Sequence, residues 1–128
     1  MNNLQEYVEQ CVAELSGPNA FKARHSLVEA GPAALPVVIE AFLAIEDPQV
    51  KVSLIQLIAE YRSNEAVPFL QEQLKDSSTA IWQAALEAMV ILCSPEALHA
   101  LHVSRATATD VQRWMIDEAI QQINAFLE

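Results

Sequence analysis

Short patterns of residues recur along the chain at intervals of about thirty residues. One pattern reads Ala-Leu-Pro at 34–36, Ala-Val-Pro at 66–68 and Ala-Leu-His at 97–99. A second pattern, an aliphatic residue followed by Lys, Trp or Gln, recurs at 50–51, 81–82 and 111–112. Repetition with a period of about 20 to 50 residues is typical of chains built from similar units that pack against their neighbours. The chain is therefore predicted to form a stack of repeated units.

Each unit is predicted to be helical. Apolar residues follow the three- and four-residue spacing of a helix over 4–15, 21–30, 35–43, 50–61, 67–74, 81–92, 97–101 and 110–127. Gly-Pro, Asp-Pro and Ser-Pro pairs at 17–18, 31–32, 47–48 and 94–95 separate several of these segments. The 2 glycines of the 128 residues are too few for the many tight turns of an all-β fold. We expect an all-α fold of about eight helices.

The predicted core lies in the middle of the chain. The segment 81–92 is apolar nearly all round, which is typical of a helix enclosed by neighbours on several sides. Cys11 and Cys93 lie in apolar helical contexts, and we expect reduced thiols rather than a disulfide. The residues expected in the central core are Leu70, Leu74, Ile81, Leu86 and Met89.

The chain is strongly acidic. Seventeen Asp and Glu residues against seven Lys and Arg residues give a formal net charge of −10. This charge repels phosphate backbones, and the basic residues form no stripe, so we expect no nucleic-acid partner. The first residues do not resemble a secretion signal, and the longest apolar run, 88–93, is too short to span a bilayer. These observations predict a cytoplasmic protein without a membrane partner.

Three stretches resemble a known repeat family. The sequences Asn-Glu-Ala-Val-Pro-Phe-Leu at 64–70 and Ser-Pro-Glu-Ala-Leu-His-Ala-Leu at 94–101 resemble the start of the outer helix of a short HEAT repeat, of the kind found in phycobilin-lyase-like proteins. The sequence Ile-Trp-Gln-Ala-Ala-Leu-Glu-Ala-Met at 81–89 resembles its inner helix. The resemblance covers 21–101 closely and 110–127 loosely. It implies a right-handed α-solenoid of about four HEAT-like helical hairpins.

The resemblance also implies a domain organisation. We expect a single domain over 1–128, with an N-terminal capping helix and turn at 1–18 and the clearest repeats at 21–103. The segment 110–127 is the expected C-terminal capping helix.

The chain departs from the family at the start of the inner helix, which usually reads Val-Arg with the arginine facing an aspartate near the hairpin turn. Asp47 and Asp76 match the aspartate. Two further positions that are usually charged hold Val52 and Ile91. At the position where the family has arginine, the three repeats of this chain are predicted to hold Lys51, Trp82 and Gln112. These departures argue against an Asp–Arg ladder between the repeats.

The resemblance places the second helix of each hairpin on the concave side of the solenoid, where such proteins bind partners. Trp82 replaces a charge there and is the expected aromatic anchor, although it could instead fold over the neighbouring hairpin as core. Trp114 is expected to be buried. The predicted partner-binding residues are Lys51, Val52, Gln56, Glu60, Trp82, Gln83, Glu87, Gln112, Arg113 and Asp117.

Catalytic and metal-binding patterns are weak. His99 and His102, with Cys93 upstream, have a spacing that could supply part of a zinc site, but a third ligand is not evident. Neighbouring carboxylates such as Asp117 and Glu118 diverge on a helix instead of converging on a pocket. We therefore expect no catalytic residue, no metal and no cofactor, and a protein that is not an enzyme.

The expected function is that of an interaction module whose partner is a protein or peptide with basic and apolar groups. An adaptor, an assembly factor or an immunity protein that neutralises a basic toxin domain all fit this description. The resemblance implies an alternative, a subunit of a phycobilin-type chromophore lyase or isomerase. Recognition of DNA lesions, a third possibility, conflicts with the charge of −10.

Overall fold

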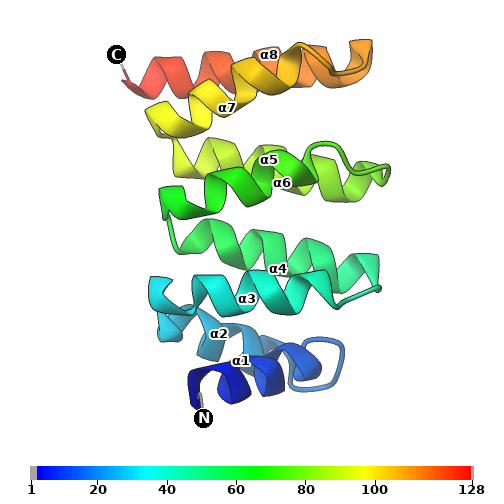
Figure 1. Ribbon diagram of the computed structural model, residues 1–128, viewed down its shortest axis with the longest axis vertical. Helices are drawn as coiled ribbons and strands as arrows, with labels where there is room; N and C mark the ends of the chain where they lie inside the picture. Colours follow the sequence, from blue (N-terminus) through cyan, green and yellow to red (C-terminus); the bar gives the residue numbers. More distant parts are fainter. Residues whose placement is uncertain (1–2, 128) are drawn as a thin grey trace.

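The computed structural model describes residues 3–127, which form four helical hairpins stacked one on another (Figure 1). Short 3-10 turns, η1 (Pro32–Ala34) and η2 (Asn64–Ala66), precede α3 and α5. This arrangement confirms the all-α fold and the repeated units. The hairpins consist of α1 (Asn3–Glu14) with α2 (Ala20–Ala30), α3 (Leu35–Leu43) with α4 (Pro48–Glu60), α5 (Val67–Gln73) with α6 (Thr79–Leu92), and α7 (Pro95–Arg105) with α8 (Asp110–Leu127).

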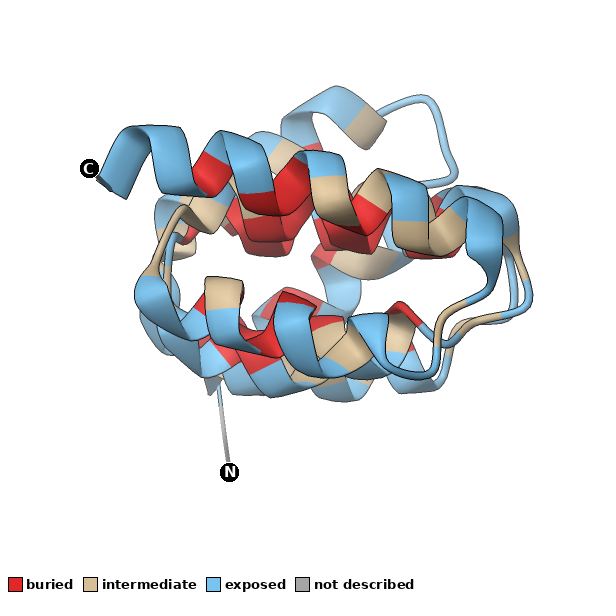
Figure 2. Cartoon of the chain, turned by 90° about the horizontal axis from the view of Figure 1, so that it is seen from above, coloured by how far each residue is buried: buried red, intermediate tan, exposed pale blue. Residues whose placement is uncertain are grey.

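The helices form two layers. Helices α1, α3, α5 and α7 make the first layer, in which α1 packs on α3 and α5 on α7. Helices α2, α4, α6 and α8 make the second layer, in which each packs on the next. Seen along the stack, the buried residues of the two layers face each other (Figure 2). Each helix therefore depends on its neighbours to cover its apolar stripe.

Local capping fixes where the helices begin and end. The Asp47 side chain accepts a hydrogen bond from the Gln49 N–H at 2.9 Å, and the Ser94 hydroxyl accepts one from the Ala97 N–H at 3.1 Å. Helix α7 runs to Arg105, beyond the stretch 97–101 in which the sequence shows the apolar spacing of a helix. His102 and Arg105 lie in its last turn, where positive side chains stabilise the carbonyl end of a helix.

The core runs through the whole stack and is densest around α6. The five predicted core residues, Leu70, Leu74, Ile81, Leu86 and Met89, are all buried. None of the buried residues in the described range is polar or charged. Both cysteines are free thiols, Cys11 buried and Cys93 half-buried. Burial raises the pKa of the Cys11 thiol, which disfavours its reactive thiolate.

Within residues 3–127, no single helix is long and apolar enough to cross a membrane. The segments Ala20–Ala30 and Pro32–Leu43 reach that length and composition only together, and they meet at an angle of 101°.

Candidate binding surface on the second layer

The second helices of the last three hairpins share one register. In their equivalent first turns, the N–H groups of Lys51, Trp82 and Arg113 donate to the carbonyl oxygens of Asp47, Ser78 and Thr109 at 3.0, 3.1 and 2.8 Å. The step along the chain from Lys51 to Trp82 equals the step from Trp82 to Arg113. The sequence assignment of Gln112 to the position of Trp82 is therefore wrong by a single position.

The corrected register changes which residues of α8 belong to the expected surface. Glu118, rather than Asp117, is equivalent to Gln56 and Glu87, and all three are exposed or half-exposed at the same place on their helices. Arg113 therefore occupies the position at which the family usually has arginine. The chain departs from the family at Lys51 and Trp82 but not at this residue.

Trp114 lies on the outside of the stack, so the expectation that it is buried is wrong. Its side chain is 64% exposed. In the preceding hairpin the equivalent residue is Gln83, whose amide nitrogen lies 4.0 Å from the sulfur of Met115 on α8, the next helix of the second layer. No further hairpin follows α8 within the described residues, and nothing there covers the indole.

Trp82 is 7% exposed, so it is not the exposed aromatic residue expected on this surface. Helix α6 packs between α4 and α8 in the second layer and also contacts α5 and α7. Trp82 therefore belongs to the core cluster, as the alternative interpretation of the sequence has it.

Two of the acidic residues expected to meet a partner already have partners within the chain. Glu60 pairs with Arg24 of α2 at 3.0 Å. Asp117 accepts hydrogen bonds from the Nε and Nη2 atoms of Arg105 at 2.6 and 3.3 Å, which lower its pKa. No ion pair within the described residues involves Glu87 or Glu118.

An apolar groove of about 410 Å³ runs between α6 and α8 beside these two carboxylates. Ile91 stands out in the sequence as an apolar residue at a usually charged position, whereas Val90, Met115 and Ala119 fit an ordinary helix core equally well and give no sign of a groove. No Lys or Arg side chain lines the groove. Its floor consists of Leu86, Val90, Ile91, Met115 and Ala119, and its polar edge of Glu87, Glu118 and Gln122.

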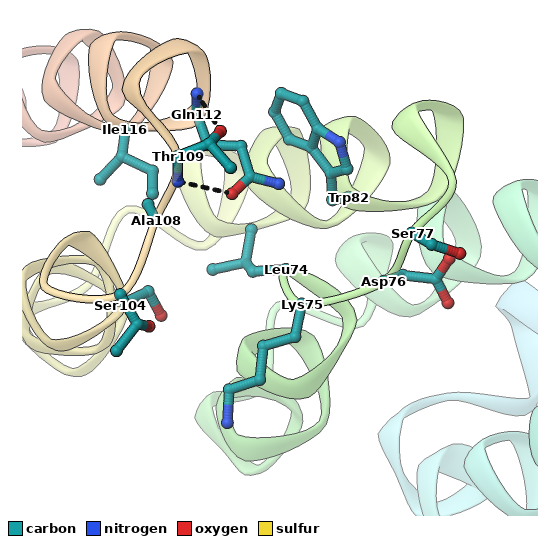
Figure 3. A pocket seen from close by; sticks show the side chains of 11 residues that line it. Leu74, Lys75, Asp76, Ser77, Trp82, Ser104, Ala108, Thr109, Gln112 and Ile116 are labelled. Carbon is teal, nitrogen blue, oxygen red and sulfur yellow. Dashed lines mark hydrogen bonds between the residues drawn. The ribbon is translucent and has the colours of Figure 1, made fainter.

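A second cavity, also of about 410 Å³, lies at the turn end of the last two hairpins (Figure 3). Trp82 and Gln112 both line it, so these two predicted site residues are close together but away from the groove. The Gln112 side-chain oxygen accepts a hydrogen bond from the Thr109 N–H at 3.2 Å, which fixes the start of α8. The wall consists of Leu74, Lys75, Asp76, Ser77, Trp82, Ser104, Thr107, Ala108, Thr109, Gln112 and Ile116.

The remaining predicted site residues, Lys51, Val52 and Arg113, are half-buried. The Lys51 ammonium lies 5.4 Å from the centre of the Phe42 ring, and the Arg113 guanidinium donates to the carbonyls of Arg105, at the end of α7, and of Ala108, in the turn that follows. Both cationic side chains therefore make contacts within the protein itself. His99 and His102 lie on α7, and residues 3–127 contain no group of three His, Cys, Asp or Glu side chains placed to hold a metal ion.

A family model described as HEAT repeats matches residues 35–123. HEAT repeats typically serve as scaffolds for protein–protein interaction. No curated protein shows a significant match to the chain. The matched region extends from α3 into the last turns of α8 and covers more than half of the sequence, so this protein belongs to the HEAT repeat family.

Proposed function

We propose that this protein is a non-enzymatic scaffold that binds another protein through the groove between α6 and α8. The partner segment carries apolar residues that enter the groove and basic residues that meet Glu87 and Glu118. An adaptor, an assembly factor or an immunity protein directed against a basic domain would all use such a surface.

The groove itself is the observation that supports this function best. Five of its eight lining residues are apolar, and Ile91 is exposed although it belongs to a helix that is otherwise mostly buried. Apolar floors edged by polar groups are typical of binding grooves. Met115 in the floor is flexible and can adapt its shape to different side chains.

Charge supports a basic partner. The Glu87 and Glu118 carboxylates are not neutralised by a basic neighbour in the described chain, and the net charge of −10 attracts basic segments over longer distances. Such complementarity mainly accelerates association and selects against acidic competitors.

The proposal can be tested with a fluorescently labelled synthetic helix that carries leucines on one face and flanking lysines. We expect saturable binding that weakens as salt is raised. The double variant Glu87→Lys, Glu118→Lys should bind about tenfold more weakly or worse, as expected for the loss of two favourable charge contacts and their reversal.

The matched control is the double variant Glu40→Lys, Glu46→Lys, which changes the net charge equally but lies on α3 and the following turn. It should bind nearly as well as the wild type, and a peptide with glutamates in place of the lysines should not bind. Equal weakening by both double variants, or unchanged binding by the groove variant, would rule out the groove as the site.

A further inference from the structure

Helix α8 continues the wall of the groove between α6 and α8 beyond both of its ends. Val111 lies four residues before Met115, and Phe126 lies four residues after Gln122. Met115 and Gln122 both line the groove. Because side chains four residues apart are neighbours on one face of a helix, Val111 and Phe126 lie on the groove side of α8. The two residues are 67% and 81% exposed.

These exposed residues and the groove form one apolar track along α8. The step of fifteen residues from Val111 to Phe126 spans about 22 Å of a regular α-helix. Ile91 of α6, which is 42% exposed, lies on the opposite wall of the groove. An exposed apolar surface of this kind, with polar residues at its edge, is typical of a site for a protein partner.

The junction between α6 and α8 is open, whereas the preceding junction is closed. In the shared register, Val90 and Met115 correspond to Ala59 and Ala84 one repeat earlier, and both alanines are buried. Helices α4 and α6 pack more closely than α6 and α8. Val90 and Met115 are larger than the alanines and only half-buried, and their size accounts for the wider spacing of α6 and α8. The groove therefore follows from side chains that the preceding junction lacks.

A helix fits this track better than an extended segment. Both walls are regular α-helices, whose backbone N–H and C=O groups bond to one another and offer no edge to a strand. The backbone of an extended segment on the apolar floor would lose hydrogen bonds to water and gain none in return. A helix satisfies its own backbone, as α7 does where it packs on α6 and α8 from the first layer.

We infer, on the basis of the proposed function of this groove, that the partner segment is an amphipathic helix of about four turns that lies along α8 from Val111 to Phe126. Basic side chains on the flanks of the partner helix meet Glu87 and Glu118, which form no ion pair within residues 3–127. A second copy of this chain is disfavoured as the partner, because it carries the same net charge of −10.

The test compares two synthetic helices of equal length, each titrated as a fluorescent peptide into the whole protein. Both carry leucines at the centre of one face and lysines on its flanks. The end-leucine peptide also has a leucine at each end of that face, about 22 Å apart, and the end-glutamine peptide has glutamine at these two positions. The end-leucine peptide should bind about tenfold more tightly, because it buries two more apolar side chains.

Two variants locate the ends of the partner helix. Val111→Ser and Phe126→Ser should each weaken binding of the end-leucine peptide about fivefold and leave binding of the end-glutamine peptide unchanged. Both residues are exposed, so the fold should stay intact, which circular dichroism checks. Phe21→Ser is the matched control, because Phe21 is 88% exposed but lies on α2. This variant should bind both peptides as the wild type does.

A third peptide tests the helical form of the partner. It is the end-leucine peptide with a proline at its centre, which breaks a helix. We expect no saturable binding of this peptide, since it cannot cover the track as one helix. Sedimentation velocity of the protein alone should show a monomer.

Four results would overturn the inference: equal affinity for the end-leucine and end-glutamine peptides, equal weakening by Phe21→Ser and Phe126→Ser, full binding of the proline peptide, or a wild-type dimer that Phe126→Ser dissociates. The third result would indicate an extended partner, and the fourth a second copy of the chain. The proposed function survives these results if the end-glutamine peptide still binds and the double variant Glu87→Lys, Glu118→Lys weakens that binding. Absence of binding by both peptides would overturn the proposed function and the inference together.

Discussion

Arg105 and Asp117 form a two-point ion pair at the positions where the preceding hairpin has Leu74 and Leu86. Each member of the pair lies one repeat after its leucine, and both leucines are buried. The leucines of one hairpin thus help to form the core of the stack, whereas the last described hairpin carries charged groups on the same face.

This ion pair predicts a pH dependence. Because the hydrogen bond from Arg105 lowers the pKa of Asp117 in the folded protein, the pair contributes stability above the ordinary aspartate pKa of about 3.9. That contribution is lost as the pH falls through the lowered value. NMR titration of the Asp117 carboxyl should show its pKa rising towards the ordinary value in Arg105→Gln. The variant Lys22→Gln, in the first hairpin, should leave it unchanged.

Tyr61 links the first and second hairpins. Its hydroxyl donates a hydrogen bond to the Leu27 carbonyl at 2.6 Å, and both residues are buried. Tyr61→Phe leaves that carbonyl without a partner, so the free energy of unfolding should fall by about 1–3 kcal/mol in urea denaturation. A loss too small to measure would contradict the assigned hydrogen bond.

Tyr61 also predicts a loss of stability at alkaline pH. Burial raises its pKa to about 12 in the folded protein, above the ordinary value of about 10. The neutral Tyr61 side chain contributes its full stabilisation at pH values below the ordinary pKa. This contribution is lost as the pH rises through the pKa of the folded state. The stability difference between wild type and Tyr61→Phe should therefore shrink from pH 10 upwards. A difference that does not change with pH would argue against a raised pKa for Tyr61.

Leu70 tests the core. Its side chain is fully buried in α5, and Leu70→Ala should lower the free energy of unfolding by about 2–5 kcal/mol. Leu43 is the matched control because it is 71% exposed, and Leu43→Ala should change stability by less than about 0.5 kcal/mol. Similar losses in both variants would contradict the assignment of Leu70 to the core.

Gly31 tests the backbone between the first two hairpins. It has φ 81° and ψ 178°, a conformation that residues with a Cβ atom rarely adopt. Gly31→Ala should therefore destabilise the protein by about 1–3 kcal/mol, although a Cβ there would meet no atom within 4 Å. At Gly17 a Cβ would meet only ordinary van der Waals contact, and thermal melts should show a smaller effect for Gly17→Ala.

Much of the fold was predictable because its causes are local. The spacing of apolar residues predicts each helix, and the pairs at 31–32, 47–48 and 94–95 mark helix boundaries that the structure has. The end of α7 is less clear from the sequence, since the residues after 101 have a weaker apolar pattern. Its last turn is instead stabilised by contacts such as the one between Arg105 and Asp117 on the next helix.

The candidate site was less predictable, because a shift of one residue rotates every side chain of a helix by about 100°. The sequence pairs Gln112 with Trp82, since an aliphatic residue precedes each of them. The backbone hydrogen bond from Arg113 to Thr109 fixes the other register. That single step moves Trp114 from the expected core to the surface and replaces Asp117 by Glu118 beside the groove.

The sequence alone determined that the chain is an acidic stack of helical hairpins, because periodicity, capping residues and net charge are properties of the residues themselves. The tertiary structure decided which side chains are accessible. Trp82 and Trp114 are the same residue type on second-layer helices, but Trp82 on α6 is packed between neighbouring helices, whereas Trp114 on α8 lies on the outer face of the last described hairpin. Exposure depends on how the neighbouring hairpins pack, and no local pattern encodes it.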